Sequence, residues 1–304
     1  GVAVRFTGLL VGPSLAAWNP ENASWPEGSC AYGEPGCPAG GGGPSPEIAR
    51  SRWSLLQLEN SSDVTLEGPQ GLEAPGQSFW AVRNENPRVR GYCLLKIDRS
   101  EDVRLHNLTL SDSPMYHVVV MRARRVSMTG LQVRLHDGDM GGVRPHNTDG
   151  VSIIASHHVR IRDSVIESGD DNIGIKEGSR WVEAEGLRLF RGKGISIGSL
   201  GERGSEDQYV SDVAFRNVYL EQCVHGVRIK TWQGGTGLVR NVSFESFTLR
   251  DVAYGVLIDQ TYCPASQRPE GCGGQDGVAQ SAILIDGVRF DSFLGTYASE
   301  QEKV

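Results

Sequence analysis

The amino-acid sequence predicts an all-β fold, a parallel β-helix whose coils stack into a single domain covering residues 1–304. Two phrases of alternating residues rich in Val, Ile and Leu recur along the chain, and alternation with a period of two is typical of strands. The phrases return at the spacing of a solenoid coil. No segment sustains an apolar period of 3.6 residues over three turns, so the sequence gives no strong helix signal.

The first phrase places a Gly or a polar residue ahead of an apolar-x-apolar run. Its copies occupy 117–120, 150–153, 172–175, 194–197, 226–229 and 255–258, at intervals of 33, 22, 22, 32 and 29 residues. The second phrase begins at residues 102, 125, 158, 181, 212 and 241, so each period holds both phrases. A coil of about 22 residues with two or three short strands, each pairing with its counterpart one coil away, is a parallel β-helix.

Alternation also assigns one set of side chains to the inside of the coils. These side chains would stack in columns and exclude water, and their burial would be the main source of stability. The predicted inward residues are Val151, Ile153, Ile173, Ile175, Ile195, Ile197, Val227 and Ile229.

Two Pro/Gly-rich stretches interrupt the pattern, at about 25–47 and 263–277, and we interpret both as irregular loops. The repeating pattern runs up to both ends of the chain, so we expect the domain to be truncated at its N- and C-terminal sides.

Composition excludes two classes of protein. The formal net charge of -7 does not provide the basic surface that nucleic-acid binding requires. No run approaches the roughly 18 apolar residues of a membrane span, so we expect no membrane partner.

Cysteines and sequons favour an extracellular setting. Cys30 and Cys37 bracket one Pro/Gly-rich loop, as Cys263 and Cys272 bracket the other, which predicts short-loop disulfide bonds. The alternative is free buried thiols in a cytosolic protein. Sequons of the N-x-S/T type favour a secreted glycoprotein, although such short motifs also occur by chance. They lie at Asn22, Asn60, Asn107 and Asn241.

Aspartates recur at the starts of the repeated strands. Asp149, Asp171, Lys193 and His225 each directly precede the Gly or Asn that opens a first phrase, so we expect one column along the coils, with Asp170 beside it. Three adjacent carboxylates raise one another's pKa and would share a proton. A shared proton beside an ionised base is what glycoside hydrolysis uses. The alternative is ordinary turn aspartates that bond their own backbone.

Cations are predicted beside these carboxylates. Arg228 and Lys230 are two residues apart in one strand and therefore point to the same outward face. Together with Lys193 and Lys176 they would form a positive floor suited to a substrate that carries carboxylates. The alternative is a set of solvated surface cations that relieve the acidic column.

The motifs resemble those of the polygalacturonases of glycoside hydrolase family 28, in order, spacing and surrounding strands and over nearly the whole chain. The matching motifs are "NTDG" at 147–150, "GDDN" at 169–172, "GKGISIGSLG" at 192–201, "GVRIKTWQGGTG" at 226–237 and "DQTYC" at 259–263.

The resemblance implies a right-handed parallel β-helix that hydrolyses α-1,4-linked galacturonic acid in pectin with inversion, without metal or other cofactor. Its partner would be the acidic polysaccharide, and we expect a monomer. Asp170 is similar to the general acid, and Asp149 and Asp171 to the pair that orients and deprotonates water. The remaining similarities concern substrate binding: Arg228 and Lys230 for the galacturonate carboxylate, Tyr262 for the aromatic lining of that subsite, and Asn147 for positioning Asp149 or the sugar.

One departure from the family pattern bears on activity. The family has "GHG" where this chain has Gly192-Lys193-Gly194, so an imidazole beside the acid is replaced by a fixed cation. A cation lowers a carboxyl pKa, so we expect a slow or acid-shifted enzyme. The alternatives are a catalytically impaired β-helix that binds acidic pectin, and a calcium-dependent pectate lyase, which the ordered hydrolase motifs disfavour.

The histidines are given minor roles. His225 could supply a substitute imidazole, but a turn histidine is more often only a surface residue. His117, His157 and His158 start other strands and are interpreted in the same way.

Overall fold

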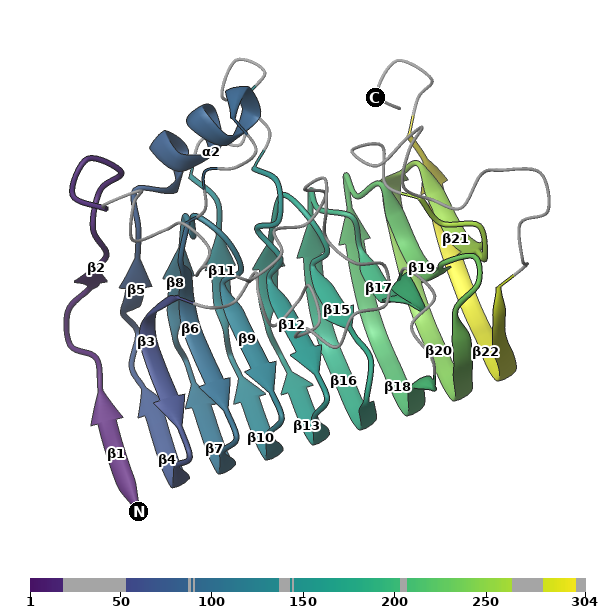
Figure 1. Cartoon of the computed structure of the whole chain (residues 1–304), viewed down its shortest axis with the longest axis horizontal. Helices are drawn as coiled ribbons and strands as arrows, with labels where there is room; N and C mark the ends of the chain where they lie inside the picture. Colours follow the sequence, from purple (N-terminus) through teal and green to yellow (C-terminus); the bar gives the residue numbers. More distant parts are fainter. Residues whose placement is uncertain are drawn as a thin grey trace.

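The computed structural model describes residues 1–18, 53–86, 89, 91–136, 143, 145–202, 207–263 and 281–298. Within these ranges successive coils of the chain contribute strands to two parallel sheets, and both sheets run along the length of the molecule (Figure 1). The predicted parallel β-helix is confirmed. The two predicted loops lie largely outside the described residues, as do Cys30, Cys37 and Cys272, so the short-loop disulfide bonds stay predictions.

The smaller sheet is built mainly from the first phrase. Its strands are β3 (Ser54–Glu59), β6 (Cys93–Asp98), β9 (Val118–Met121), β12 (Val151–Ile154), β15 (Ile173–Ile175), β17 (Ile195–Leu200), β19 (His225–Thr231) and β21 (Tyr254–Asp259).

The larger sheet contains the second phrase, and from β16 onward a single long strand spans what earlier coils divide between two. Its strands are β1 (Val2–Arg5), β2 (Leu10–Val11), β4 (Ser62–Glu67), β5 (Gly71–Glu73), β7 (Glu101–His106), β8 (Thr109–Ser111), β10 (Arg124–Thr129), β11 (Gln132–Arg134), β13 (His157–Arg162), β14 (Val165–Glu167), β16 (Ser179–Phe190), β18 (Gln208–Glu221), β20 (Thr236–Val252) and β22 (Ala282–Tyr297).

Register fixes the stacking of the coils. In the smaller sheet Val151 pairs with Ile173, Ile173 with Ile195 and Ile195 with Val227. All eight predicted inward side chains are fully buried, so their prediction is confirmed. A second stack in the larger sheet is aromatic, with the rings of Phe215, Phe244 and Phe290 spaced 5.6 Å and 5.3 Å apart. These columns hold the outward side chains of successive coils about 4.8 Å apart.

Among the residues that the structure describes, one α-helix interrupts the strands. Helix α2 (Gly76–Glu85) lies beyond the ends of β5 and β8 in Figure 1 and has no counterpart in our sequence analysis. Its apolar anchors are Phe79 and Trp80, both buried, and the indole Nε1–H of Trp80 donates to the carbonyl of Ser113 at 3.0 Å. The buried residues Gly76, Phe79, Trp80 and Arg83 lie on one face of the helix, but only Phe79 and Trp80 are large and apolar, so the sequence shows no apolar periodicity over three turns. Among the described helices, none has the length and apolarity to cross a membrane.

Two of the described sequons, at Asn60 and Asn107, directly follow strands, and a third, at Asn241, lies within β20. All three asparagines are exposed and have left-handed φ angles of 48°, 53° and 53°. Asparagine tolerates this conformation better than most residues, which suits it to these positions. The fourth sequon, at Asn22, lies outside the described residues. Cys93 and Cys223 are buried.

Candidate active site

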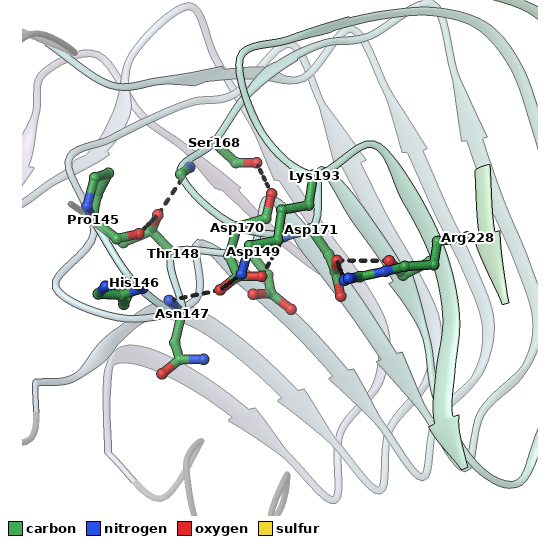
Figure 2. A network of polar contacts seen from close by, with 12 residues as sticks. Pro145, His146, Asn147, Thr148, Asp149, Ser168, Asp170, Asp171, Lys193 and Arg228 are labelled. Carbon is green, nitrogen blue, oxygen red and sulfur yellow. Dashed lines mark hydrogen bonds and ion pairs between the residues drawn. The ribbon is translucent and has the colours of Figure 1, made fainter. Parts of the chain in front are cut away.

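The register brings the predicted column together. Because Val151, Ile173, Ile195 and Val227 are successive partners, the residues two positions earlier, Asp149, Asp171, Lys193 and His225, lie on neighbouring coils. Main-chain bonds tie the turns directly: the Gly150 N–H donates to the Asp171 carbonyl at 3.0 Å, and the Lys193 N–H to the Asp170 carbonyl at 2.7 Å. Figure 2 shows Asp149, Asp170 and Asp171 close together, as predicted.

Asp171 is the centre of the charge cluster. Its Oδ1 accepts from the Ser196 hydroxyl at 2.6 Å and from the Arg228 guanidinium at 3.2 Å. Its Oδ2 accepts from Lys230 Nζ at 2.9 Å and from Lys176 Nζ at 3.4 Å. Burial raises the pKa of this carboxyl, but Lys230, Lys176 and Arg228 together outweigh burial and bring the pKa well below its ordinary value. Asp171 is therefore ionised.

Strand alternation explains how these cations converge. Ser196 and Arg228 are paired residues of β17 and β19, while Gly198 pairs with Lys230 one step along. Gly174 lies between the outward residues of its neighbouring coils, and a Cβ there would lie 2.8 Å from Lys176 Cε. The missing side chain at 174 leaves the space in which Lys176 crosses toward the aspartates. The four predicted cations therefore lie beside the carboxylates, with Lys176, Arg228 and Lys230 on Asp171 and Lys193 on Asp170.

Asp170 is held by three donors. Its Oδ2 accepts from Lys193 Nζ at 3.0 Å and from the Asn147 main-chain N–H at 3.1 Å, and its Oδ1 accepts from the Asp171 N–H at 3.0 Å. Burial raises the pKa of Asp170, but the ammonium groups of Lys193 and Lys230 bring it below its ordinary value. The expectation that mutual repulsion would raise the pKa of neighbouring aspartates is wrong for Asp170 and Asp171, because cations surround both carboxylates.

Asp149 is buried on the other side of Lys176. Its Oδ2 accepts from the Ser152 hydroxyl at 2.8 Å and lies 3.8 Å from Lys176 Nζ. Its carbonyl oxygen accepts the main-chain N–H of His117 at 2.8 Å and lies 3.1 Å from His117 Nδ1. One ammonium thus lies between the carboxylates of Asp149 and Asp171.

Tyr262 lies beside the cations, as predicted. Its ring centroid is 5.7 Å from Arg228 Cζ and 5.5 Å from Lys230 Nζ, and the ring packs edge-on against Trp232. Burial raises the pKa of the Tyr262 hydroxyl. Burial also lowers the pKa of Lys230 to about 8, against the opposing attraction of Asp171. Lys230 can therefore lose its proton near neutral pH.

A model of the glycosyl hydrolases family 28 matches residues 49–304. The chain belongs to this family. A probable polygalacturonase of Arabidopsis thaliana is 32% identical over 258 residues, which are 84% of this chain and 54% of the relative. A polygalacturonase of Persea americana is 32% identical over 255 residues, 83% of this chain and 52% of the relative. The chain spans about half the length of the curated relatives it matches.

Solved structures agree on the fold. The endo-xylogalacturonan hydrolase from Aspergillus tubingensis superposes with a TM-score of 0.65 at 20% sequence identity, covering 83% of this chain and 78% of that one. At this identity the likeness concerns the fold alone.

Lys193 occupies the position where the resemblance implies a histidine. Its ammonium pairs with Asp170, the carboxyl that resembles the family's acid, and its own pKa is raised mainly by that carboxylate. His225, one coil on, is not the surface residue that its turn position suggested: it is buried, stacks on Tyr254 at 5.4 Å, and burial lowers its pKa to about 4.

The other histidines divide in the same way. His117 is fully buried beneath Asp149, which corrects its interpretation as a surface residue, and burial lowers its pKa to about 4. His158 is exposed and stacks on Trp181, with His157 packed edge-on against the same indole, so both belong to the larger sheet and its outer face.

Three contributors escaped the sequence analysis. Ser196 could have been found, because it precedes Arg228 by the same 32 residues that separate the paired phrases. Ser152 lies in β12, three residues after Asp149, and donates a hydrogen bond to its carboxylate. Arg83 gave no signal, because it lies on α2, outside the repeat, and donates to the side-chain oxygen of Asn147 at 2.9 Å. Asn147 itself contacts Asp170 rather than Asp149 through its N–H.

Proposed function

We propose that this protein is an inverting glycoside hydrolase that cleaves α-1,4-galacturonosyl linkages in pectin. The observation that carries the proposal is the placement of Asp149, Asp170 and Asp171 on adjoining coils, with Arg228 and Lys230 bonded to or packed beside them. Carboxylates supply the acid and base of glycoside hydrolysis, and a cluster of cations supplies recognition of a uronate. Family membership and the polygalacturonase relatives support the same activity.

Asp170 is proposed as the general acid. In its protonated form it would donate to the glycosidic oxygen as the C1–O bond breaks, so that the leaving sugar departs as a neutral alcohol. Its carboxyl is buried and positioned by main-chain donors from Asn147 and Asp171, which supports a fixed direction of proton transfer.

Asp149 and Asp171 are proposed to orient and deprotonate the attacking water. Attack on C1 from the face opposite the leaving group inverts the anomeric configuration. Asp171 is ionised by its surrounding cations and can accept a hydrogen bond from water throughout the reaction. Asp149 is held by Ser152 and Lys176, so both acceptors have fixed orientations.

Recognition of the galacturonate carboxylate is assigned to Arg228, Lys230 and Lys193, with Tyr262 as the ring beneath the sugar. A substrate carboxylate would share the cations that contact Asp171 and would raise the pKa of Lys230, because a second anion favours its charged form. A sugar without the carboxylate would leave these buried cations less well compensated, which disfavours neutral galactan.

The alternative function is a catalytically impaired β-helix that binds acidic pectin. The contact between Lys193 and Asp170 favours it, because an acid held ionised by a neighbouring ammonium donates protons poorly. A reducing-sugar assay on polygalacturonic acid between about pH 4 and pH 7 separates the two functions. The enzyme would release reducing ends, with proton NMR showing the β-anomer first, whereas a binder would retain the polymer uncut.

The remaining features of the proposal concern the setting of the protein. We propose a secreted, monomeric, single-domain glycoprotein of the cell wall or extracellular space that uses no metal. Exposed sequons at Asn60, Asn107 and Asn241 support N-glycosylation. Expression in a secreting eukaryotic host, followed by enzymatic deglycosylation and mass spectrometry, tests this: an unchanged mass after treatment would contradict glycosylation at these sites.

A further inference from the structure

Arg83 links α2 to the turn that precedes β12. The side chain is 8% exposed, and its guanidinium reaches three oxygens of two separate segments. Nη1 donates to the carbonyls of His146 at 2.7 Å and Pro114 at 3.3 Å, and Nη2 donates to Asn147 Oδ1 at 2.9 Å. The planar fork of an arginine is suited to such a contact, because its donors have fixed relative directions.

The turn held by Arg83 in turn contacts the proposed acid. Asn147 has a left-handed φ of 56°, and its N–H donates to Asp170 Oδ2 at 3.1 Å, a contact drawn in Figure 2. Next to it the Thr148 hydroxyl donates to the Pro145 carbonyl at 2.7 Å and accepts from the Gly169 N–H at 3.0 Å. The turn is therefore bonded both to Arg83 on one side and to the Gly169–Asp170 segment on the other.

Helix α2 provides a rigid base for this contact. Phe79 and Trp80 are buried, and Trp80 also bonds the Ser113 carbonyl, one residue before the Pro114 carbonyl that Arg83 contacts. A side chain on a packed helix has a well-defined position, so it restricts the conformation of a neighbouring loop more than a side chain on another loop would.

We propose that Arg83 is a positioning residue, which fixes the Asn147 peptide so that its N–H stays on the Asp170 carboxylate. Its effect on catalysis rests on the proposed function, whereas its effect on Asp170 does not. The charged groups that face Asp170 are Lys193 from the turn before β17, Lys230 from β19 and the adjoining Asp171. Arg83 acts on Asp170 only through the turn.

The first test measures Asp170 without substrate. Carbon-13 NMR titration, with the Asp170 signal assigned from an Asp170→Asn variant, would compare the parent with Arg83→Met. Losing a donor that favours the charged carboxylate should raise the Asp170 pKa, by an amount on the order of one unit. Arg83→Lys, which keeps a cation and can serve fewer of the three oxygens, should give an intermediate shift and also serves if Arg83→Met does not fold.

The second test is kinetic. In Arg83→Met we expect kcat on polygalacturonate to fall about tenfold, because the acid is less well oriented, with KM nearly unchanged. The alkaline limb of the pH profile should move to higher pH, since an acid of higher pKa stays protonated longer. A variant that only lost stability would reduce the active fraction equally at every pH and would leave the limb in place.

Arg122→Met is the matched control, because Arg122 makes a two-point contact with buried Asp98 at 2.9 Å and 2.6 Å, away from the turn. It should keep the parent's Asp170 pKa and kcat. An unchanged Asp170 pKa in both Arg83 variants, or an equal shift in Arg122→Met, would overturn the inference. A parent that does not cut polygalacturonate would defeat the proposed function instead, while the NMR titration would still decide the role of Arg83.

Discussion

Replacing Lys193 by methionine tests how the cation at this position affects the acid. Lys193 Nζ lies 3.0 Å from Asp170 Oδ2, and the lysine side chain is 35% exposed. An opposite charge this close lowers a carboxyl pKa by about 1–3 units, and solvent screening at a partly exposed cation favours the lower end. Lys193→Met removes the charge at every pH, so the Asp170 pKa should rise by about one unit, whereas a histidine at 193 would itself be protonated in the acid range where Asp170 titrates.

The consequence for the rate follows from the sign of this shift. A general acid must be protonated, so activity is lost as the pH rises through its pKa. Raising that pKa by about one unit moves the alkaline limb of kcat/KM upward by the same amount, and increases the rate about tenfold at a pH above the parent's limb. Because Lys193 is also proposed to bind the uronate, KM should rise, and kcat and KM must be measured separately.

The assay is initial-rate reducing-sugar release from polygalacturonic acid, measured from about pH 3 to pH 8 for the parent, Lys193→His and Lys193→Met. Lys193→Met separates loss of charge from gain of an imidazole: Lys193→Met should shift the limb, whereas Lys193→His, which is charged in that pH range, should shift it less and add a second titration near the pKa of the imidazole. If Lys193→Met has the rate and the pH profile of the parent, the reasoning from the Lys193–Asp170 contact is refuted.

Three further predictions concern the cations, the central aspartate and the core. Since the pKa of Lys230 is about 8, KM for a galacturonate oligomer should rise between about pH 7 and pH 9, and Lys230→Arg should flatten that rise; a pH-independent KM in the parent would contradict it. Asp171→Asn should lower the free energy of unfolding by about 3 kcal/mol at neutral pH in urea titrations, because it leaves buried cations uncompensated. Since the pKa of Asp171 is lowered, its stabilisation is present above about pH 4 and is lost as pH falls through the lowered value, so parent and variant should converge in acid and not at neutral pH. Phe244→Ala should lower the free energy of unfolding by about 3–5 kcal/mol, since it opens a gap in the aromatic stack, whereas a loss under 1 kcal/mol would show that the neighbouring rings collapse into the space.

The spacing of the phrases in the sequence by itself determined the fold and which residues of the candidate site lie on neighbouring coils. Strands in a solenoid pair with their counterparts one period away, so a constant offset between Ile173 and Ile195 also sets the offset between Asp171 and Lys193. Side-chain alternation then determined that Arg228 and Lys230 share a face, and the structure has both on Asp171.

The tertiary structure decided the charge state of that site and its support. Adjacency alone suggested carboxylates that raise one another's pKa, whereas distances show that Lys230, Lys176 and Arg228 all reach Asp171. A pKa depends on every charge within a few ångströms. The register predicts which residues lie on neighbouring coils, but it does not predict how far or in which direction their side chains reach.

The sequence also gave no account of Arg83. Residues of the repeat have partners at a known offset, but α2 lies outside it, and Arg83 meets Asn147 across 64 residues without any periodic relation. Such a contact exists only because buried apolar side chains place the helix beside the turn. The spacing of repeated residues predicts which strands pair. The position of a single helix depends on three-dimensional packing, which residue spacing does not predict.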